Sequence, residues 1–422
     1  MSDDTSGACY ELSGLAELKG EVPVGGSKNA SLPVMAASLL AGAEVTLHNV
    51  PRLMDVDTME KALSSLGARI SVEGNTVVID TSDITSFETS FELMNMMRAS
   101  IYVMGPLLAR FGRAKTALPG GCAIGSRPID YHLAGFEKMG AQIRIDHGFI
   151  DARCDKLRGA RIFLDFPSVG ATANLMMAGT LAEGTTTIEN AAQEPHIKDL
   201  GWFLKSLGAR VSGEGTKTIT IQGVSKLHGT THTMIADQIE AGTFLAAAAI
   251  TRGTVDILNA EIKDLKPIVE KLREMGVNIR EMQNVLKVSA KKKLKAVKVT
   301  TLPCPGFPTD MQPQMIALCS TADGVSIVKE TVWENRFMHA AEFMRMGADI
   351  EVQGNTCIVN GGRQLTGSKV VAPDLRAGAA LVLAGLAAQN SSTVYKIHHI
   401  DRGYENFEGK LSALGADIKR VQ

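Results

Sequence analysis

The stretch LPGGCAIGSRPID, residues 118–130, places a cysteine among three glycines and close to an arginine. The glycines give an open backbone, and both Arg127 and the helix start expected at Pro128 favour the thiolate form of Cys122. We therefore expect a chemical role for Cys122, with a small buried apolar cysteine as the alternative. The segment is interpreted as a lid that brings a thiol over a bound anion and excludes water. The other five cysteines are interpreted as buried apolar residues.

Further polar residues stand where a hydrophobic core would reject them. Arg98 and Arg376 each lie within an apolar run, where a buried charge without an anionic partner is costly. The partner can be a structural carboxylate or a ligand phosphate, and any single charge at a helix start can also be a simple cap. Helix N-termini also carry free N–H groups that attract anions. The residues at the expected starts of buried helices are Lys28, Asn29, Arg98, Ser168, Val169, Gly170, Asp237, Glu240, Asp310 and Arg376. Those in loops are Asp55, Asp57, 122–130, Glu194, 334–336, Asp401 and Arg402.

The motifs that the sequence lacks narrow the chemistry. There is no GxxxxGK[ST] loop and no GxGxxG fingerprint, so we expect phosphate to be bound by side chains and helix ends. The histidines show no HExxH spacing, so no catalytic metal is expected, and magnesium held by scattered acidic residues is the open alternative.

Composition excludes several classes of protein. The chain has 422 residues, 45% of them hydrophobic, and a formal net charge of -1, which gives no reason to expect nucleic acid as a partner. Six scattered cysteines without a CxxC pair argue against a zinc site or a disulfide framework. No segment has the character of a signal peptide or a membrane span. We expect a soluble cytoplasmic protein with one large domain or two domains of ordinary size. The sequence does not indicate the oligomeric state.

The elements that must position these residues are repeated. Six amphipathic helices end in a leucine- or methionine-glycine step, at intervals of 68 to 73 residues, and each is followed by an alternating hairpin. The glycines are Gly67, Gly140, Gly208, Gly276, Gly347 and Gly415. Six helices that are apolar nearly all round precede these steps, as expected of buried helices. They are expected at 29–42, 94–112, 169–184, 239–253, 309–324 and 374–389.

Each repeat therefore predicts a buried helix, a strand, a surface helix and a hairpin. The sequence stops after one strand of the sixth hairpin, and residues 10–28 resemble the segment that leads into the sixth buried helix. We expect the N-terminal strand to cross over and complete the C-terminal half. This gives two α/β domains, 28–235 and 1–27 plus 236–422, with one continuous six-repeat solenoid as the alternative.

Several longer motifs carry a resemblance that runs in order over nearly the whole chain. They are KNASLP (28–33), MRAS (97–100), LPGGCAIGSRPID (118–130), SVGAT (168–172), FPTDMQ (307–312), ETVWENRFMH (330–339), DLRA (374–377) and HIDRGYE (399–405). Together they resemble the UDP-N-acetylglucosamine enolpyruvyl transferases, within the enolpyruvyl transferase family. The resemblance implies two inside-out α/β barrels, each of three repeats with buried helices surrounded by short sheets, and an active site in the cleft between them.

The resemblance also implies a reaction in peptidoglycan precursor synthesis. Enolpyruvate would pass from phosphoenolpyruvate to the 3-hydroxyl of UDP-N-acetylglucosamine, with release of phosphate through a tetrahedral intermediate. No metal or organic cofactor is implied, and Cys122 would donate a proton, form a covalent adduct with phosphoenolpyruvate and be the site of fosfomycin alkylation. The expected partners are these two small molecules, with neither nucleic acid nor membrane.

The remaining roles are carried over by motif. Asp310 would orient the sugar hydroxyl and accept its proton. Residues implied to bind phosphoenolpyruvate are Lys28, Asn29, Cys122, Arg127, Arg376 and Arg402. Residues implied to bind the nucleotide sugar are Arg98, Arg127, Pro128, Ile129, Asp130, Tyr131, Ser168, Val169, Asp310 and Val332.

Three alternatives remain beside this interpretation. The sister transferase that acts on shikimate 3-phosphate lacks a thiol loop like that around Cys122. A catalytically silent protein that binds the nucleotide sugar is disfavoured because Lys28, Cys122, Asp310 and Arg402 are all present. A cysteine hydrolase would need a His/Asn set at a recognisable spacing.

Overall fold

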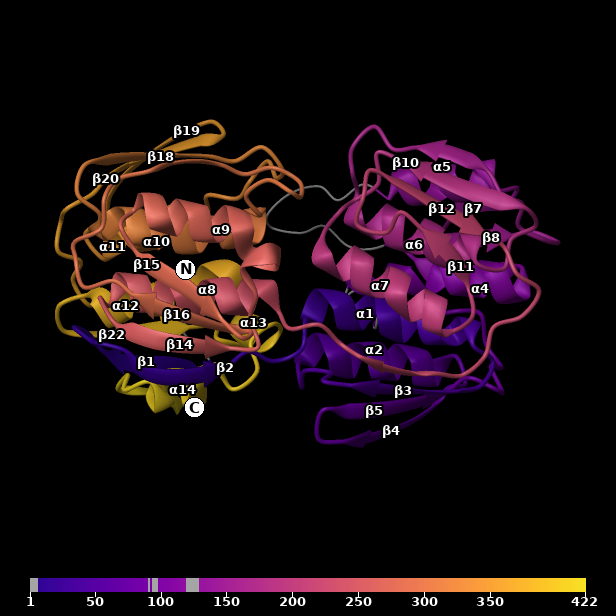
Figure 1. The fold of residues 1–422 in the computed structure, drawn as a ribbon, viewed down its shortest axis with the longest axis horizontal. Helices are drawn as coiled ribbons and strands as arrows, with labels where there is room; N and C mark the ends of the chain where they lie inside the picture. Colours follow the sequence, from indigo (N-terminus) through magenta and orange to yellow (C-terminus); the bar gives the residue numbers. More distant parts are fainter. Residues whose placement is uncertain (1–6, 90–91, 93–97, 119–128) are drawn as a thin grey trace. The chain divides into compact units, whose positions relative to one another are not determined.

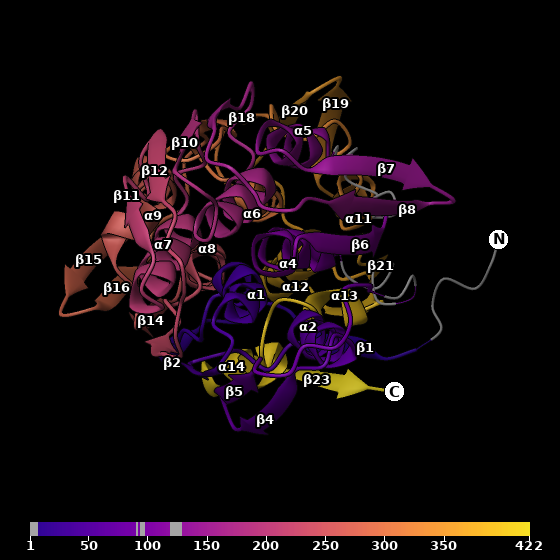
Figure 2. The same ribbon diagram turned by 90° about the vertical axis from the view of Figure 1, so that its right-hand side faces the viewer.

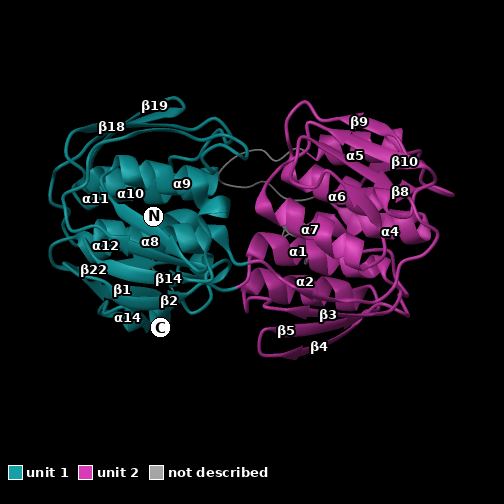
Figure 3. Cartoon of the chain, viewed as in Figure 1, with its two compact units in different colours: residues 1–25, 122–126, 236–422 teal, residues 26–121, 127–235 magenta. Residues whose placement is uncertain are grey.

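The chain folds into two compact units, each with a hydrophobic core of its own. The computed structural model describes residues 7–89, 92, 98–118 and 129–422. Within these, residues 7–25 and 236–422 belong to unit 1, and the described residues from 26 to 235 belong to unit 2 (Figure 3).

The repeat predicted from the sequence is confirmed in both units (Figure 1). An inner helix is followed by a strand, an outer helix and an antiparallel hairpin. The inner helices of unit 2 are α1 (Lys28–Ala37), α4 (Met104–Phe111) and α6 (Val169–Gly179), and its outer helices are α2 (Met54–Ser65), α5 (Asp130–Lys138) and α7 (Pro195–Ser206). The inner helices of unit 1 are α8 (Gln238–Ile250), α10 (Gln312–Thr321) and α12 (Leu375–Ala387), and its outer helices are α9 (Ile262–Glu274), α11 (Ala340–Arg345) and α14 (Phe407–Ala413).

The described part of unit 2 contains three short sheets, and inner helices pack against strands of two of them (Figure 2). The first, in the order β13-β3-β5-β4, consists of β13 (Thr231–Thr233), β3 (Glu44–His48), β5 (Thr76–Asp80) and β4 (Arg69–Glu73). The second, β6-β8-β7, consists of β6 (Arg113–Ala117), β8 (Phe149–Arg153) and β7 (Gln142–Asp146). The third, β11-β12-β10-β9, consists of β11 (Arg210–Ser212), β12 (Thr218–Gln222), β10 (Thr185–Glu189) and β9 (Arg161–Phe163).

Unit 1 has three four-stranded sheets of the same kind. The first, β15-β16-β14-β2, consists of β15 (Asn278–Met282), β16 (Val285–Ser289), β14 (Thr254–Leu258) and β2 (Lys19–Pro23). The second, β17-β18-β20-β19, consists of β17 (Lys298–Thr300), β18 (Val325–Lys329), β20 (Thr356–Asn360) and β19 (Asp349–Gln353). The third, β21-β22-β1-β23, consists of β21 (Lys369–Val371), β22 (Ser391–Tyr395), β1 (Cys9–Ser13) and β23 (Ile418–Val421).

The inner helices are buried on all sides because their sequences are apolar all round. In α8 every residue after Gln238 is buried, and α8, α10 and α12 pack against one another and each against its own sheet. An all-apolar helix of this kind stabilises the fold only when other elements cover it completely. The first polar residues before each apolar run are therefore left at the ends of the buried helices.

The six glycines that follow the outer helices all have a left-handed backbone. Their φ angles are +107° at Gly67, +95° at Gly140, +100° at Gly208, +94° at Gly276, +88° at Gly347 and +96° at Gly415. Residues with a Cβ adopt this region at a cost, so glycine is the residue that ends the helix and turns the chain into the hairpin.

The two ends of the chain meet in one sheet. Strand β1 pairs antiparallel with both β22 and β23, so that Tyr10 lies between Val394 and Arg420. The N-terminal strand thus supplies the partner that the last hairpin lacks, as the sequence predicts. Strand β2 pairs in parallel with β14 of the same unit.

The helix predicted over 94–112 is wrong in one respect. Its described part is a 3₁₀ segment, η2 (Arg98–Val103), followed by α4. The side-chain amide of Asn174 in α6 accepts a hydrogen bond from the Gly105 N–H (2.9 Å) and donates one to the Ile101 carbonyl (3.0 Å). These two groups would bond each other in a continuous α-helix, so Asn174 interrupts the helix by satisfying both.

The described cysteines follow the prediction only in part. Cys9, Cys319 and Cys357 are buried, as expected. Cys154 and Cys304 are partly exposed, which corrects the prediction for these two, because both lie in loops outside the apolar helices. Among the described residues, no helix combines the length and apolarity needed to cross a bilayer.

We predict that Phe244→Ala lowers the free energy of unfolding of unit 1 by about 3–5 kcal/mol, because the ring is fully buried beside Phe407 and its loss leaves a cavity. The chain has two tryptophans, Trp202 in unit 2 and Trp333 in unit 1. Urea unfolding followed by fluorescence in a Trp202→Phe background therefore reports on unit 1.

The matched control is Met282→Ala, whose side chain is exposed in the same unit. It should change the free energy of unfolding by less than about 0.5 kcal/mol. Equal effects of the two substitutions would contradict the assignment of the core.

Candidate functional site

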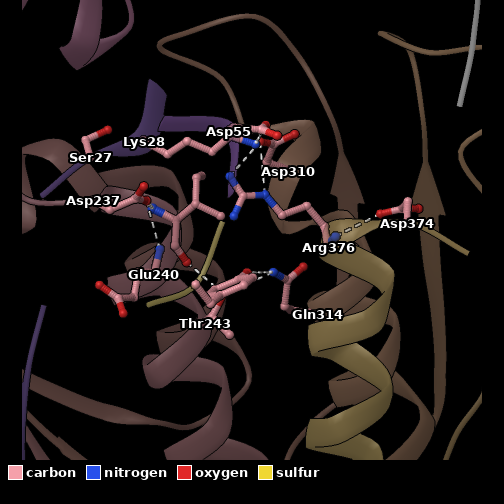
Figure 4. Close-up of polar contacts among 12 residues, drawn as sticks. Ser27, Lys28, Asp55, Asp237, Glu240, Thr243, Asp310, Gln314, Asp374 and Arg376 are labelled. Carbon is pink, nitrogen blue, oxygen red and sulfur yellow. Dashed lines mark hydrogen bonds and ion pairs between the residues drawn. The ribbon is translucent and has the colours of Figure 1, made fainter. Parts of the chain in front are cut away.

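Two buried arginines lie in unit 1 around the partly buried Asp310. This residue belongs to the 3₁₀ turn η3 (Thr309–Met311) that leads into α10. The buried guanidinium of Arg376, at the start of α12, holds one carboxylate oxygen through Nε at 3.2 Å and Nη2 at 3.1 Å (Figure 4). A second buried guanidinium, that of Arg336, approaches the other oxygen at 3.3 Å. The alternative of a structural carboxylate partner for Arg376 is therefore realised.

These two arginines have more donors than the surrounding protein satisfies. In the described part of the chain, Nε and Nη1 of Arg336 and Nη1 of Arg376 are buried and have no hydrogen-bond partner. A buried guanidinium N–H without an acceptor is costly, and planar guanidinium groups are suited to bind carboxylate and phosphate oxygens. The cluster can therefore accept an anionic ligand in addition to Asp310.

The cationic form of Arg376 is maintained by its neighbours. Burial lowers the pKa of Arg376, but Tyr404 and the carboxylates of Asp310 and Asp237 outweigh that effect, and the pKa is raised overall. The arginine therefore stays charged and can attract an anion at any pH at which the protein is folded.

A polar group beneath Arg376 comes from three separate elements. The Tyr404 ring lies 5.4 Å from the guanidinium carbon, and its hydroxyl is 2.8 Å from the Thr243 hydroxyl of α8. Gln314 of α10 donates to both hydroxyls, at 3.1 Å to Thr243 and 3.3 Å to Tyr404 (Figure 4). Burial raises the pKa of Tyr404, so the phenol keeps its proton.

The starts of four buried helices carry side-chain caps. Asp374 accepts from the N–H groups of Arg376 (2.8 Å) and Ala377 (3.0 Å) at α12. The same role belongs to Asp237 at α8, Ser27 at α1 and Ser168 at α6. The alternative that a charge at a helix start is a simple cap is therefore confirmed for Asp237, and cap side chains occupy some of the N–H groups that an anion could use. Anion binding here depends more on side chains than on helix ends.

Glu240 has a structural role in unit 1. Its carboxylate accepts from the Gly25 N–H at 2.8 Å and pairs with Lys410 at 2.6 Å. Burial raises the pKa of Glu240 even though Lys410 opposes the effect. The pair ties the start of α8 to α14 and to the segment after β2.

In unit 2 the charge at the start of α1 is paired. Lys28 lies 2.6 Å from the Asp55 carboxylate of α2, and both side chains are nearly inaccessible (Figure 4). The neighbouring Asn29 is partly exposed. A buried pair of this kind holds the ammonium group in one place.

A second polar cluster of unit 2 lies under the start of α6. Asn174, which splits the helix before α4, donates to Nδ1 of His132 at 2.9 Å, so the imidazole proton is on Nε2. A Cβ at Gly170 would lie 3.0 Å from that Nε2, which explains the glycine after Ser168 and Val169. His132 and Asn174 thus lie under 168–170, the segment that the family resemblance implies to bind the nucleotide sugar.

Several predicted site residues are not described. Cys122, Arg127 and Pro128 lie outside the described residues, as does the side chain of Arg98. Ile129 and Tyr131 are partly buried at the start of α5, and Asp130 is exposed. The Val332 N–H donates to Glu330 at 2.8 Å. Arg402 directly follows the short helix α13 (His398–Asp401), two residues before Tyr404.

The sequence analysis includes Arg336 among the candidate polar residues of the loops, in 334–336, but misses Gln314 and Tyr404 as site residues. Arg336 and Tyr404 lie within the motifs ETVWENRFMH and HIDRGYE, which marked them, but neither received a role. Gln314 and the buried Gln312 carry a further signal, two glutamines within an otherwise apolar helix. Among the described residues, no group of three or more His, Cys, Asp or Glu side chains could hold a metal ion.

Six α/β repeats around buried helices, with paired arginines on one aspartate, define a class of α/β protein suited to anionic ligands. The chain belongs to the EPSP synthase (3-phosphoshikimate 1-carboxyvinyltransferase) family, whose model matches residues 12–411. It is 53% identical over 414 residues to UDP-N-acetylglucosamine 1-carboxyvinyltransferase 2 of Carboxydothermus hydrogenoformans, covering 98% of this chain and 99% of that protein. It is 51% identical over 411 residues to UDP-N-acetylglucosamine 1-carboxyvinyltransferase of Geotalea uraniireducens, covering 97% and 99%.

Solved structures agree with this membership. The enolpyruvyl transferase NikO from Streptomyces tendae superposes with a TM-score of 0.90 at 27% identity, over 98% of this chain and 99% of NikO. EPSP synthase from Acinetobacter baumannii gives a TM-score of 0.75 at 19% identity, over 99% and 100% of the two chains, and shows a shared fold.

We predict that the stability of unit 2 depends on pH through His132. Burial lowers the pKa of His132 from 6.5 to about 4. Below pH 6.5 the unfolded chain therefore binds a proton that the folded chain does not, and the free energy of unfolding falls as the pH decreases toward 4. Between about pH 7 and about pH 5 the loss should be about 2 kcal/mol.

Urea unfolding of a Trp333→Phe background, read through Trp202, measures this loss. His132→Gln should lower the stability at neutral pH and remove most of the pH dependence. The control His147→Gln replaces a histidine whose side chain is 93% exposed and should leave both unchanged. The same pH dependence with and without His132 would show that other groups cause it.

Proposed function

We propose that this protein transfers enolpyruvate from phosphoenolpyruvate to the 3-hydroxyl of UDP-N-acetylglucosamine and releases phosphate. One observation carries the proposal: three relatives with 51–53% identity over 97–98% of the chain are UDP-N-acetylglucosamine 1-carboxyvinyltransferases. The product would be a precursor of peptidoglycan, formed in the cytoplasm. The fold would then be two inside-out α/β barrels, 28–235 and 1–27 plus 236–422.

The chemistry requires held anions, an acid and a base. A proton adds to C3 of phosphoenolpyruvate while the sugar oxygen adds to C2 and loses its own proton; loss of a C3 proton and of phosphate then restores the double bond. Positioned charges lower the barrier of both steps because they are fixed before the reaction. No metal or organic cofactor takes part in this scheme.

The proposed roles in unit 1 follow from its arginines. Asp310 orients the sugar hydroxyl and accepts its proton, and Arg376 and Arg402 neutralise the carboxylate and phosphate. The unsatisfied donors of the buried Arg336 support an added role for it beside Arg376, on the same anions. Guanidinium groups that already have one carboxylate partner are held in place for a second acceptor.

The remaining proposed groups come from residues 28–169 of the sequence. Lys28 and Asn29 bind phosphoenolpyruvate together with Arg127, and Cys122 donates the proton and forms the covalent adduct. Residues proposed to bind the nucleotide sugar are Arg98, 127–131, Ser168 and Val169, with Asp310 and Val332 from unit 1. The reaction therefore requires both units.

The first test is phosphate release by the purified protein. Release from phosphoenolpyruvate should occur only when UDP-N-acetylglucosamine is present, because the leaving phosphate departs from the adduct of both substrates. Shikimate 3-phosphate is the control acceptor and should give only background release. Equal release with shikimate 3-phosphate would assign the chain to the sister activity instead.

The second test concerns the thiol. Cys122→Ser should abolish covalent labelling by fosfomycin and most turnover, because an alcohol is a weaker acid and nucleophile than a thiol. Mass spectrometry of the intact protein measures the labelling. Cys154→Ser, which changes a partly exposed cysteine without a proposed role, should label and turn over as the unchanged protein does. Labelling that survives in Cys122→Ser would place the reactive thiol elsewhere.

A further inference from the structure

A chain of polar contacts joins the two ends of the protein to the segment that carries Arg402. The guanidinium of Arg420, in the last strand β23, holds both carboxylate oxygens of Asp401, with Nη1–Oδ2 at 3.0 Å and Nη2–Oδ1 at 2.6 Å. Asp401 is the last residue of α13, and Arg402 follows it directly. Arg420 thus fixes the backbone immediately before Arg402, the residue proposed to bind phosphoenolpyruvate.

Arg420 is in turn fixed from the other side. Its Nε donates to Glu408 at 2.7 Å and its Nη2 to the Tyr10 hydroxyl at 2.8 Å, while that hydroxyl donates to Glu408 at 2.7 Å. Tyr10 is fully buried in β1, and its ring lies 5.1 Å from the Arg420 guanidinium carbon. Tyr10 and Arg420 are also direct partners in the ladder between β1 and β23.

The network differs from an ordinary surface ion pair. An isolated exposed pair contributes little because two mobile side chains have to be ordered. Here the guanidinium makes a bidentate contact with one carboxylate and contacts a second, and a buried phenol restrains it, so that much of this ordering is already achieved.

The same short segment is held at its other end. Two residues after Arg402, the Tyr404 ring packs on Arg376 and its hydroxyl bonds to Thr243. Arg402 therefore lies between two fixed residues. Asp401 before it is bound to Arg420 of β23, and Tyr404 after it contacts Thr243 of α8 and Arg376 of α12. Without the first of these contacts, the Asp401 carboxylate would also lose the charge compensation that Arg420 provides, directly before an arginine that is proposed to attract an anion.

We propose that Arg420 is a positioning residue for the reaction: it fixes Asp401 and neutralises its charge, so that Arg402 meets the anionic groups of phosphoenolpyruvate. The role rests on the proposed function. Tyr10 and Glu408 act through Arg420 and not on the substrate.

The test compares variants by steady-state kinetics and binding. Arg420→Gln should raise the KM for phosphoenolpyruvate about tenfold, a loss of one bidentate charged contact, with kcat and the Kd of UDP-N-acetylglucosamine within about twofold. Arg420→Lys keeps the positive charge but cannot make the bidentate contact, and it should give a smaller rise in the KM for phosphoenolpyruvate. Tyr10→Phe removes only the hydroxyl and should also give a smaller rise.

A matched control distinguishes this role from general stability. Arg363→Gln removes the guanidinium from the exposed pair with Asp349 in the same unit, where the contact is 2.6 Å, and should leave the KM unchanged. The double variant Asp401→Asn with Arg420→Gln should raise the KM for phosphoenolpyruvate no more than the more severe single variant does, because the two substitutions remove the same contact. Additive effects, or equal weakening of both substrates, would overturn the proposal.

A second readout is independent of the activity. Amide hydrogen exchange in 398–404 should accelerate in Arg420→Gln and not in Arg363→Gln. If the unchanged protein fails to use the two substrates, the proposed function is wrong, and the exchange still decides whether Arg420 holds the segment. Unchanged exchange at 398–404 would refute the positioning role even if the activity is as proposed.

Discussion

The structure depends on the burial of two guanidinium groups on one carboxylate. Arg336 and Arg376 are each about 3% exposed, and Asp310 contacts both of them. Burial of charges is tolerated only with good partners, and donors on both arginines have none within the described residues. An anion that supplied acceptors for these donors would stabilise the site, and its binding would at the same time complete the local hydrogen bonding.

The repeated architecture explains how such charges can be held at all. An inner helix that is apolar all round has to be covered along its whole length, which leaves its N-terminal end as the place for polar residues. Cap residues there satisfy the first N–H groups, as Asp374 does for α12, and the following long side chain is free of that task. The inner helices thus present Lys28 and Arg376 from rigid elements rather than from loops. This rigidity keeps both charges in place beside their carboxylate partners, Asp55 and Asp310.

The sequence predicts the features that repeat and misses those that join distant residues. Left-handed glycines and apolar helices recur six times, and each recurrence strengthens the pattern. Nothing local indicates that Asn174 would replace a hydrogen bond within another helix, since Gly105 is 69 residues away. The position of Arg376 within an apolar run indicates a buried charge from the sequence alone. Its partner Asp310 lies 66 residues earlier, and only the folded structure shows that the two are paired. The sequence therefore indicates which residues belong to the site, but it does not indicate which residues they contact.

The closure of unit 1 connects these points. The last repeat lacks a strand of its own, and β1 fills the gap, so Tyr10 and Arg420 become neighbours across the ladder although 410 residues separate them. A chain end that only completed a sheet would need apolar residues and backbone bonds. The pairing of β1 with β23 instead brings together a buried phenol, an arginine and two carboxylates. The partial burial of these charged groups costs free energy that their mutual contacts have to offset. Such groups are better explained by the segment that they fix, 398–404, than by the stability of the sheet.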